Sequence, residues 1–178
     1  GYMLGSYVLG LDTGWPAVGF AALVAVCLAA AYAAIGAAWL IHKTEGALQV
    51  KAVAWLRASL GLVALGMAAI SLATPLASAR IWDRWLGFPE TLVLAPLPIL
   101  TLGLFLWLWR LSGKLPLEGD RMNLAPFAAL AGIFALGFAG LAWSFYPYVV
   151  PGRITITEAA SATESLAIIL AGTLFVLP

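Results

Sequence analysis

The chain has 178 residues, of which 63% are hydrophobic and only 10% are charged, and its formal net charge is +1. Soluble domains average about 25% charged residues, so this chain has too few polar groups to cover its own surface in water. We therefore expect an integral membrane protein. The nearly neutral charge gives no sign of the concentrated basic patch that marks nucleic-acid binding, and no nucleic-acid partner is expected.

Four long runs without charged residues predict membrane-spanning helices. A helix needs about 20 apolar residues to cross a hydrocarbon layer that is about 30 Å thick. The runs cover residues 15–41, 58–79, 91–109 and 122–152. A further apolar run, 165–178, is too short to cross. Because the chain starts at Gly1 rather than at a Met and ends inside this run, we expect it to be a piece of a longer protein.

These runs predict the fold class, an all-α membrane protein with an antiparallel four-helix transmembrane bundle and the start of a fifth, peripheral helix. We expect residues 1–14 to form an outward-facing segment, residues 15–152 the bundle, and residues 153–178 an outward loop with a truncated final transmembrane helix. Two stripes of alanine repeat at every fourth position, which lets helices approach closely in lipid. The stripes are Ala29, Ala33 and Ala37, and Ala131, Ala135 and Ala139.

The distribution of Lys and Arg predicts the orientation in the membrane. One side carries most of them, namely Lys43, Lys51, Arg57, Arg110, Lys114 and Arg121. The opposite side carries Arg80, Arg84 and Arg153. Cytoplasmic loops hold the excess of positive charge. We therefore expect the first set to face the cytoplasm, and residues 80–90 and 152–164 to face outward together with residues 1–14.

The chain offers few side chains that could carry chemistry. Its single histidine, His42, ends the first helix, where an interfacial polar residue is a simpler interpretation than a haem or metal ligand. No acidic residue lies within the four long apolar runs. We therefore expect no catalytic, cofactor-binding or metal-binding residue in this chain.

Two charged residues are structural or interface candidates, Arg57 and Glu45. Arg57 could snorkel to the membrane interface, pair with an acid on another helix or subunit, or belong to a proton path, because ionisable residues inside a bilayer are usually functional. Glu45 belongs to a tight polar turn at 42–46, in which Gly46 would allow a positive φ. The second alanine stripe is the third candidate, consisting of Ala131, Ala135 and Ala139.

Read in order, several segments resemble the C-terminal half of subunit II of the cytochrome bd-type quinol oxidases, including the cyanide-insensitive branch. The segments are WLIHKTEGALQ at 39–49, RW at 84–85, FP at 88–89, LAPLP at 94–98, WSFYPYVVP at 143–151, ITI at 154–156, EAA at 158–160 and LAGTLF at 170–175. The chain departs from the family at 152–153, where Gly-Arg replaces a frequent Pro and Ser, and at 157–158, where Thr-Glu replaces a frequent Trp-Asp.

The resemblance implies a fold of two four-helix bundles with one peripheral helix, of which this chain would be the second bundle and the beginning of the peripheral helix. It implies a respiratory complex of the bacterial cytoplasmic (inner) membrane that oxidises quinol and reduces oxygen to water. Haem b and haem d would lie in subunit I. This multi-pass subunit II would bind no haem, would scaffold subunit I as a heterodimer, and would help to supply proton and oxygen access.

The same resemblance sets the expected partners and cofactors. The partners are subunit I, membrane lipids, the quinol pool reached through subunit I, and in some complexes a small single-helix subunit. A structural quinone in subunit II is the one cofactor that the resemblance leaves open. We expect one of the alanine stripes to contact subunit I.

Two other classes of protein remain as alternatives. A small polytopic transporter or channel would line a site near the membrane midplane with polar or broken helices, which the long apolar runs do not suggest. A membrane anchor or assembly protein would have no redox role. Co-migration with haem separates this alternative from an oxidase subunit.

Overall fold

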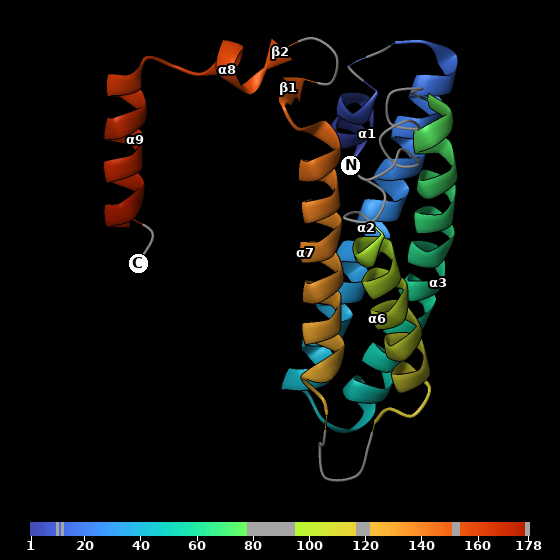
Figure 1. The fold of residues 1–178 in the computed structure, drawn as a ribbon. Coiled ribbons are helices and arrows are strands. Elements are labelled where there is room, and N and C mark those ends of the chain that lie inside the picture. Colours follow the sequence, from blue (N-terminus) through green and yellow to red (C-terminus); the bar gives the residue numbers. More distant parts are fainter. Residues whose placement is uncertain (10, 12, 78–94, 117–121, 151–153, 177–178) are drawn as a thin grey trace.

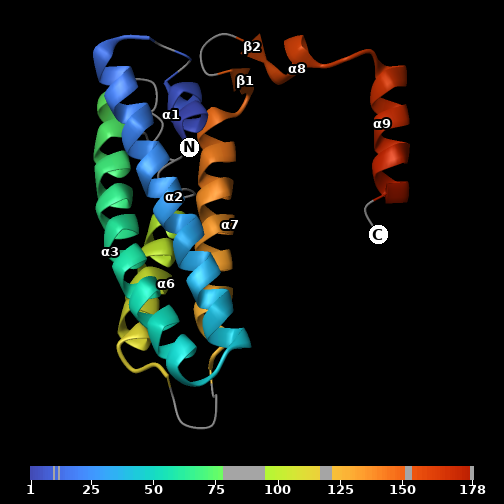
Figure 2. The same cartoon turned by 180° about the vertical axis from the view of Figure 1, so that it is seen from behind.

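The chain folds into an α-helical bundle, shown by a computed structural model in Figures 1 and 2. The structure describes residues 1–9, 11, 13–77, 95–116, 122–150 and 154–176. Along the chain the elements are α1 (Tyr2–Val8), α2 (Trp15–Lys43), α3 (Gly46–Ala77), α6 (Pro96–Ser112), α7 (Ala125–Phe145), β1 (Tyr148–Val150), β2 (Ile154–Thr155), α8 (Ile156–Ala159) and α9 (Thr163–Val176). The expected all-α membrane fold is confirmed, with one short pair of strands added.

Three described helices are long and apolar enough to cross a membrane: α2, α3 over Gly46–Ser71, and α7. The third predicted span corresponds to α6, which is 17 residues long, and residues 91–94 at its expected start lie outside the described part of the chain. Figures 1 and 2 show α2, α3, α6 and α7 side by side, with consecutive helices running in opposite directions. This is the expected antiparallel bundle.

Two helix boundaries differ from the charge-free runs. Helix α3 begins at Gly46, ahead of Lys51 and Arg57, rather than at residue 58, because Lys and Arg are good helix formers and near a helix end can reach the membrane surface. Helix α7 ends at Phe145, because Pro147 lacks an N–H and disfavours helical dihedrals at the residue before it.

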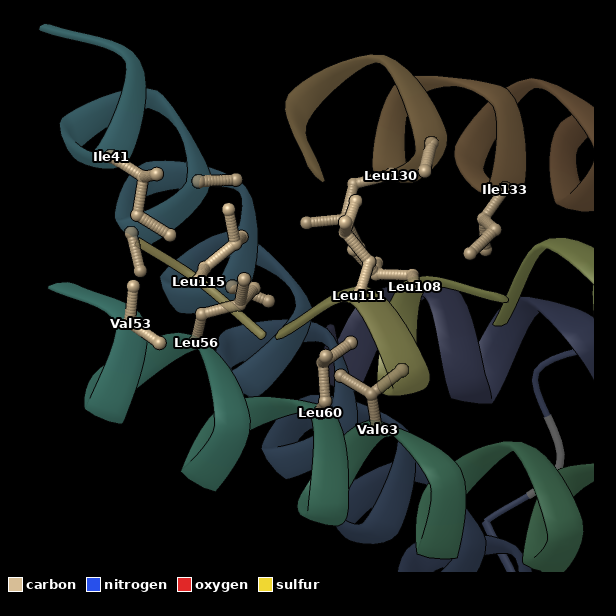
Figure 3. Close-up of a cluster of buried hydrophobic side chains, with 14 of the residues drawn as sticks. Ile41, Val53, Leu56, Leu60, Val63, Leu108, Leu111, Leu115, Leu130 and Ile133 are labelled. Atoms are coloured by element: carbon tan, nitrogen blue, oxygen red, sulfur yellow. The ribbon is translucent and has the colours of Figure 1, made fainter. Parts of the chain in front are cut away.

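The bundle core lies between α2, α3, α6 and α7. Its fully buried side chains include Ile41 of α2, Leu56 and Leu60 of α3, Leu108 of α6 and Leu130 of α7. Figure 3 shows these side chains meeting between the helices. No charged side chain is buried among the described residues, so the interior of this part is held by apolar packing.

Small residues bring α2 and α3 into close contact. The buried alanines on α2 include Ala30, Ala34, Ala37 and Ala38. Of the predicted stripe, Ala37 is therefore buried, whereas Ala29 and Ala33 are exposed. Gly66 of α3 faces Cys27 of α2 so tightly that a Cβ at Gly66 would lie 2.0 Å from the Cys27 Sγ. Small residues thus lie where α2 meets α3, and only one member of the predicted stripe, Ala37, is buried. The role of that stripe stays a prediction.

The N-terminal segment contains a short helix that packs against α2. A Cβ at Gly5 would lie 2.5 Å from the Ala21 Cα, and one at Gly1 would lie 2.4 Å from the Ala25 Cα. These two close approaches, four residues apart on each helix, set α1 directly on the backbone of α2. Whether residues 1–14 face outward stays a prediction.

The C-terminal segment leaves the bundle through the strand pair. Strands β1 and β2 are antiparallel, with Tyr148 opposite Thr155. Helix α8 follows, and α9 then runs at a distance from the bundle, as Figures 1 and 2 both show. Every described residue of α9 is exposed. This helix is therefore joined to the bundle by the connecting segment and does not pack against the described helices.

Candidate functional site

No group of three or more His, Cys, Asp or Glu side chains that could hold a metal ion occurs in the described residues. His42 lies in the last turn of α2, and its ring centroid is 5.7 Å from that of Trp39. That environment is an aromatic contact at a helix end. The polar side chains of the described part lie mainly in the turns and at the helix ends.

The turn between α2 and α3 is closed by side-chain hydrogen bonds. The N–H of Thr44 donates to the carbonyl oxygen of Leu40 at 2.9 Å, and its Oγ1 donates to the same oxygen at 2.7 Å. The Nε2 of Gln49 donates to the carbonyl oxygen of Ile41 at 3.2 Å. Gly46 has a φ of +63°, which favours glycine. The expected positive φ at Gly46 is confirmed.

The roles of Thr44 and Gln49 were missed by sequence reasoning. Helix ends leave backbone carbonyls without partners in the helix, and the Gln49 amide satisfies one of them, that of Ile41, at the end of α2. The Thr44 hydroxyl adds a second hydrogen bond to the Leu40 carbonyl, which already accepts the Thr44 N–H. The sequence did hint at a role for Gln49, because it is an uncharged polar residue between apolar neighbours in the first turn of α3. The segment 39–49 thus has a structural role in joining the two helices.

An aromatic cluster ties the end of α2 to the start of α7. The ring centroids of Trp39 and Phe127 are 5.1 Å apart, and the Nζ of Lys43 lies 5.2 Å from the centre of the Trp39 ring. Such a cation–π contact attracts the ammonium to the ring face. The cluster lies where a half-exposed indole and a lysine are expected at a membrane surface.

The structure places the candidate residues apart from one another. Glu45 is exposed in the turn between α2 and α3, and Arg57 is exposed three turns into α3. Arg57 points away from the interior that Leu56 and Leu60 fill. An interface role for either charged residue stays a prediction.

The alanine stripe of α7 lies on the outside of the bundle. Ala131, Ala135 and Ala139 are all exposed, while Ala129, Leu130 and Ile133 form the buried face of the same helix. Phe138, beside the stripe, is 74% exposed. Each of the three stripe positions is therefore exposed in the part of the chain that the structure describes.

A second set of contacts joins α1 to the opposite end of α7. The ring of Tyr7 meets that of Phe145 edge to face, with centroids 5.4 Å apart, and the Tyr7 hydroxyl donates to the carbonyl oxygen of Val149. Beyond it, Thr155 and Glu158 form a reciprocal cap on α8. Hydrogen bonds from the Thr155 backbone and side chain hold the pKa of the Glu158 carboxyl below its ordinary value.

The long apolar helices, their antiparallel packing and their uncharged interior define a multi-pass α-helical membrane protein. Residues 1–178 match the family described as cytochrome bd terminal oxidase subunit II, so the chain belongs to this family. The resemblance seen in the sequence is confirmed. Comparisons with curated proteins and with solved structures gave no match. Family membership makes the chain a subunit of a haem-containing respiratory quinol oxidase and implies a complex with subunit I.

Proposed function

We propose that this chain is the non-haem subunit that scaffolds the haem-bearing subunit I and helps to supply proton and oxygen access. The observation that carries the proposal is the exposed face of α7 formed by Ala131, Ala135 and Ala139. A face of small residues that is exposed among the described residues is suited to a close helix neighbour in lipid.

The physical argument starts from how helices associate in a bilayer. Lipid tails are as apolar as leucine side chains, so packing rather than the hydrophobic effect drives association, and small residues allow the closest approach. Within α7, Leu130 and Ile133 already face the bundle, and a Cβ at Gly132 would lie 3.4 Å from the Leu104 Cδ1 of α6. The alanine face is the side that remains for another subunit.

The finer features of the family resemblance belong to the same proposal. Haem b and haem d lie in subunit I, and the quinol pool is reached through it. Subunit I is the heterodimer partner, with a small single-helix subunit and a structural quinone as further components. The complex lies in the bacterial cytoplasmic membrane, with the turn that contains Glu45 on the cytoplasmic side.

A role in proton and oxygen access concerns the buried polar side chains and the placement of the helices. The buried polar side chains in the described part are Gln49, Ser112 and Asn123, all in the half of the bundle that holds the α2–α3 turn. Proton relays inside membranes use ionisable side chains, and none is buried in this part. Arg57 lies at the surface of α3. In this proposal the chain influences the access of protons and oxygen to subunit I by positioning helices.

The scaffold role is tested by placing a bulky ring on the alanine face of the full-length subunit. Ala135→Phe should lower recovery of the haem-containing complex after purification in mild detergent, because the ring separates the two subunits. Ala68→Phe is the matched control, since Ala68 is an exposed alanine on α3. The measurement is the haem absorption spectrum together with the ratio of the two subunits. If the haem-containing complex is recovered equally well from both variants, the alanine face of α7 does not contact subunit I.

A further inference from the structure

An apolar groove opens on the outside of the bundle between α2 and α3. It has a volume of about 430 Å³ and is lined by Ala33, Gly36, Ala37, Leu40, Trp55, Ala58 and Ser59. Small residues form most of this lining, so the two helices leave a hollow where larger side chains would fill the space. Trp55, at one wall, is 51% exposed. Figure 2 shows α2 with α3 alongside it.

The groove ends near the joined ends of α2 and α3, where the charge is positive. Lys51 is exposed and lies one turn before Trp55, hence on the same face of α3. Lys43 lies at the end of α2, and its ammonium already contacts Trp39. Glu45 is the only described acidic residue at this end of the bundle, against several described Lys and Arg residues.

We propose that this groove binds one anionic phospholipid, with an acyl chain along the small residues and the phosphate beside Lys51. Tryptophan favours the headgroup level of a bilayer, so Trp55 places the mouth of the groove where a phosphate lies. Anionic headgroups attract lysines near the membrane surface. The proposal rests on insertion in a membrane and is independent of the scaffold role of α7.

A helix of another protein fits this groove less well than a lipid. It would cover the exposed face of α3 that carries Trp55 and Lys51, and an ammonium buried in an apolar interface is costly unless an acid pairs with it. A phospholipid supplies both groups in the required order, since its apolar chain fills the hollow and its phosphate stays at the wet end with Lys51.

The test uses the fluorescence of Trp55 in the intact oxidase complex reconstituted into phosphatidylcholine vesicles. The Trp55 signal is the difference between the wild-type complex and its Trp55→Phe variant. Lipids with brominated acyl chains quench an indole that they touch, and brominated phosphatidylglycerol is compared with brominated phosphatidylcholine at equal mole fractions. We expect the anionic lipid to quench Trp55 at about fivefold lower mole fraction, the preference that one lysine near an anionic surface provides.

Two variants locate the site. Lys51→Gln should make the two lipids quench equally, whereas Lys114→Gln, at an exposed lysine beyond α6, should leave the preference unchanged. Trp107, 42% exposed on α6 and so away from the alanine face of α7, gives the reference signal for ordinary lipid contact through a Trp107→Phe difference. The haem spectrum of each sample shows that the complex is assembled.

Each other outcome overturns the proposal. Equal quenching of the wild-type Trp55 signal by both lipids would mean that the groove meets only bulk lipid. An absence of quenching by either lipid would mean that a protein segment covers the groove. A preference that survives Lys51→Gln would place the anionic headgroup elsewhere.

Discussion

The side-chain amide of Gln49 on α3 donates a hydrogen bond to the backbone carbonyl oxygen of Ile41 on α2, at 3.2 Å. Gln49 is 5% exposed and Ile41 is fully buried. The bond therefore satisfies, away from water, one of the carbonyls that the end of a helix leaves without a partner. It also fixes the first turn of α3 against the last turn of α2.

Gln49→Leu should destabilise the protein, because the apolar side chain cannot donate to the Ile41 carbonyl. Leaving a buried backbone acceptor unsatisfied costs about 1–3 kcal/mol. The measurement is the midpoint of thermal unfolding of the detergent-solubilised complex, which should fall. Leu48→Gln, at the exposed neighbouring position, is the control and should leave the midpoint unchanged. A Gln49→Leu midpoint equal to that of the wild type would show that the bond contributes nothing.

The contact of Gly66 with Cys27 gives a second prediction. A Cβ at Gly66 would lie 2.0 Å from the Cys27 Sγ and 2.7 Å from its Cβ. Gly66→Ala should therefore push α2 and α3 apart, and overpacking of this kind costs about 1–3 kcal/mol. The expected result is a lower unfolding midpoint and a lower yield of folded protein.

The geometry also specifies a rescue for Gly66→Ala. Cys27→Gly removes both atoms that the new methyl group meets, so the double variant should recover much of the lost stability. Gly61→Ala is the control within the same helix, because a Cβ at Gly61 meets nothing within 4 Å. A double variant as unstable as Gly66→Ala alone would show that this contact does not limit the spacing of the helices.

Helix α1 supplies a third prediction at Gly5. Its added Cβ would lie 2.5 Å from the backbone Cα of Ala21, and a backbone atom cannot move aside as a flexible side chain can. Gly5→Ala should therefore release α1 from α2. The readout is faster hydrogen–deuterium exchange of the α1 amides, while Gly19→Ala, which has open space around the added carbon, should leave that exchange unchanged. Unaltered amide exchange in Gly5→Ala would show that the close contact of Gly5 with Ala21 does not hold α1 against α2.

Hydropathy predicted the long helices because bilayer thickness sets a minimum apolar length. It placed α2 nearly at its true bounds, since only His42 and Lys43 lie between the end of the apolar run and the end of the helix. It missed the first turns of α3, because Lys51 and Arg57 interrupt the apolar run without interrupting the helix. It did not predict α1, because this helix is short and packs against α2 through contacts such as Gly5 with Ala21, which are distant in the sequence.

Which face of each helix packs against its neighbours could not be predicted from the sequence. Helices α2 and α7 are apolar on every side, so no polar face marks the outside. Spacing alone therefore could not choose between Ala33, which is exposed, and Ala34, which is buried. The stripe at Ala135 was found from its spacing, but its exposure on α7 needed the packed bundle.

The cap of α8 gives a prediction for pH dependence. The backbone N–H of Thr155 donates to the Glu158 carboxylate at 2.8 Å, and the Thr155 Oγ1 donates to the same oxygen at 2.8 Å. These bonds favour the ionised form and lower the pKa of Glu158. The contribution to order in α8 is therefore fully present above the ordinary pKa of glutamate, and it is lost as the pH falls through the lowered pKa.

Thr155→Ala should raise the pKa of Glu158 towards its ordinary value, because the hydroxyl donor is removed while the backbone donor remains. The measurement is a carboxyl ¹³C NMR titration of detergent-solubilised protein with labelled glutamate, in which Glu158→Gln identifies the signal. Thr163→Ala, at the start of α9, is the control and should leave the Glu158 titration unchanged. A titration of Glu158 that is the same in Thr155→Ala and in the wild type would show that the Thr155 hydroxyl does not hold the carboxylate, and the order of α8 would then have to come from the backbone bond alone.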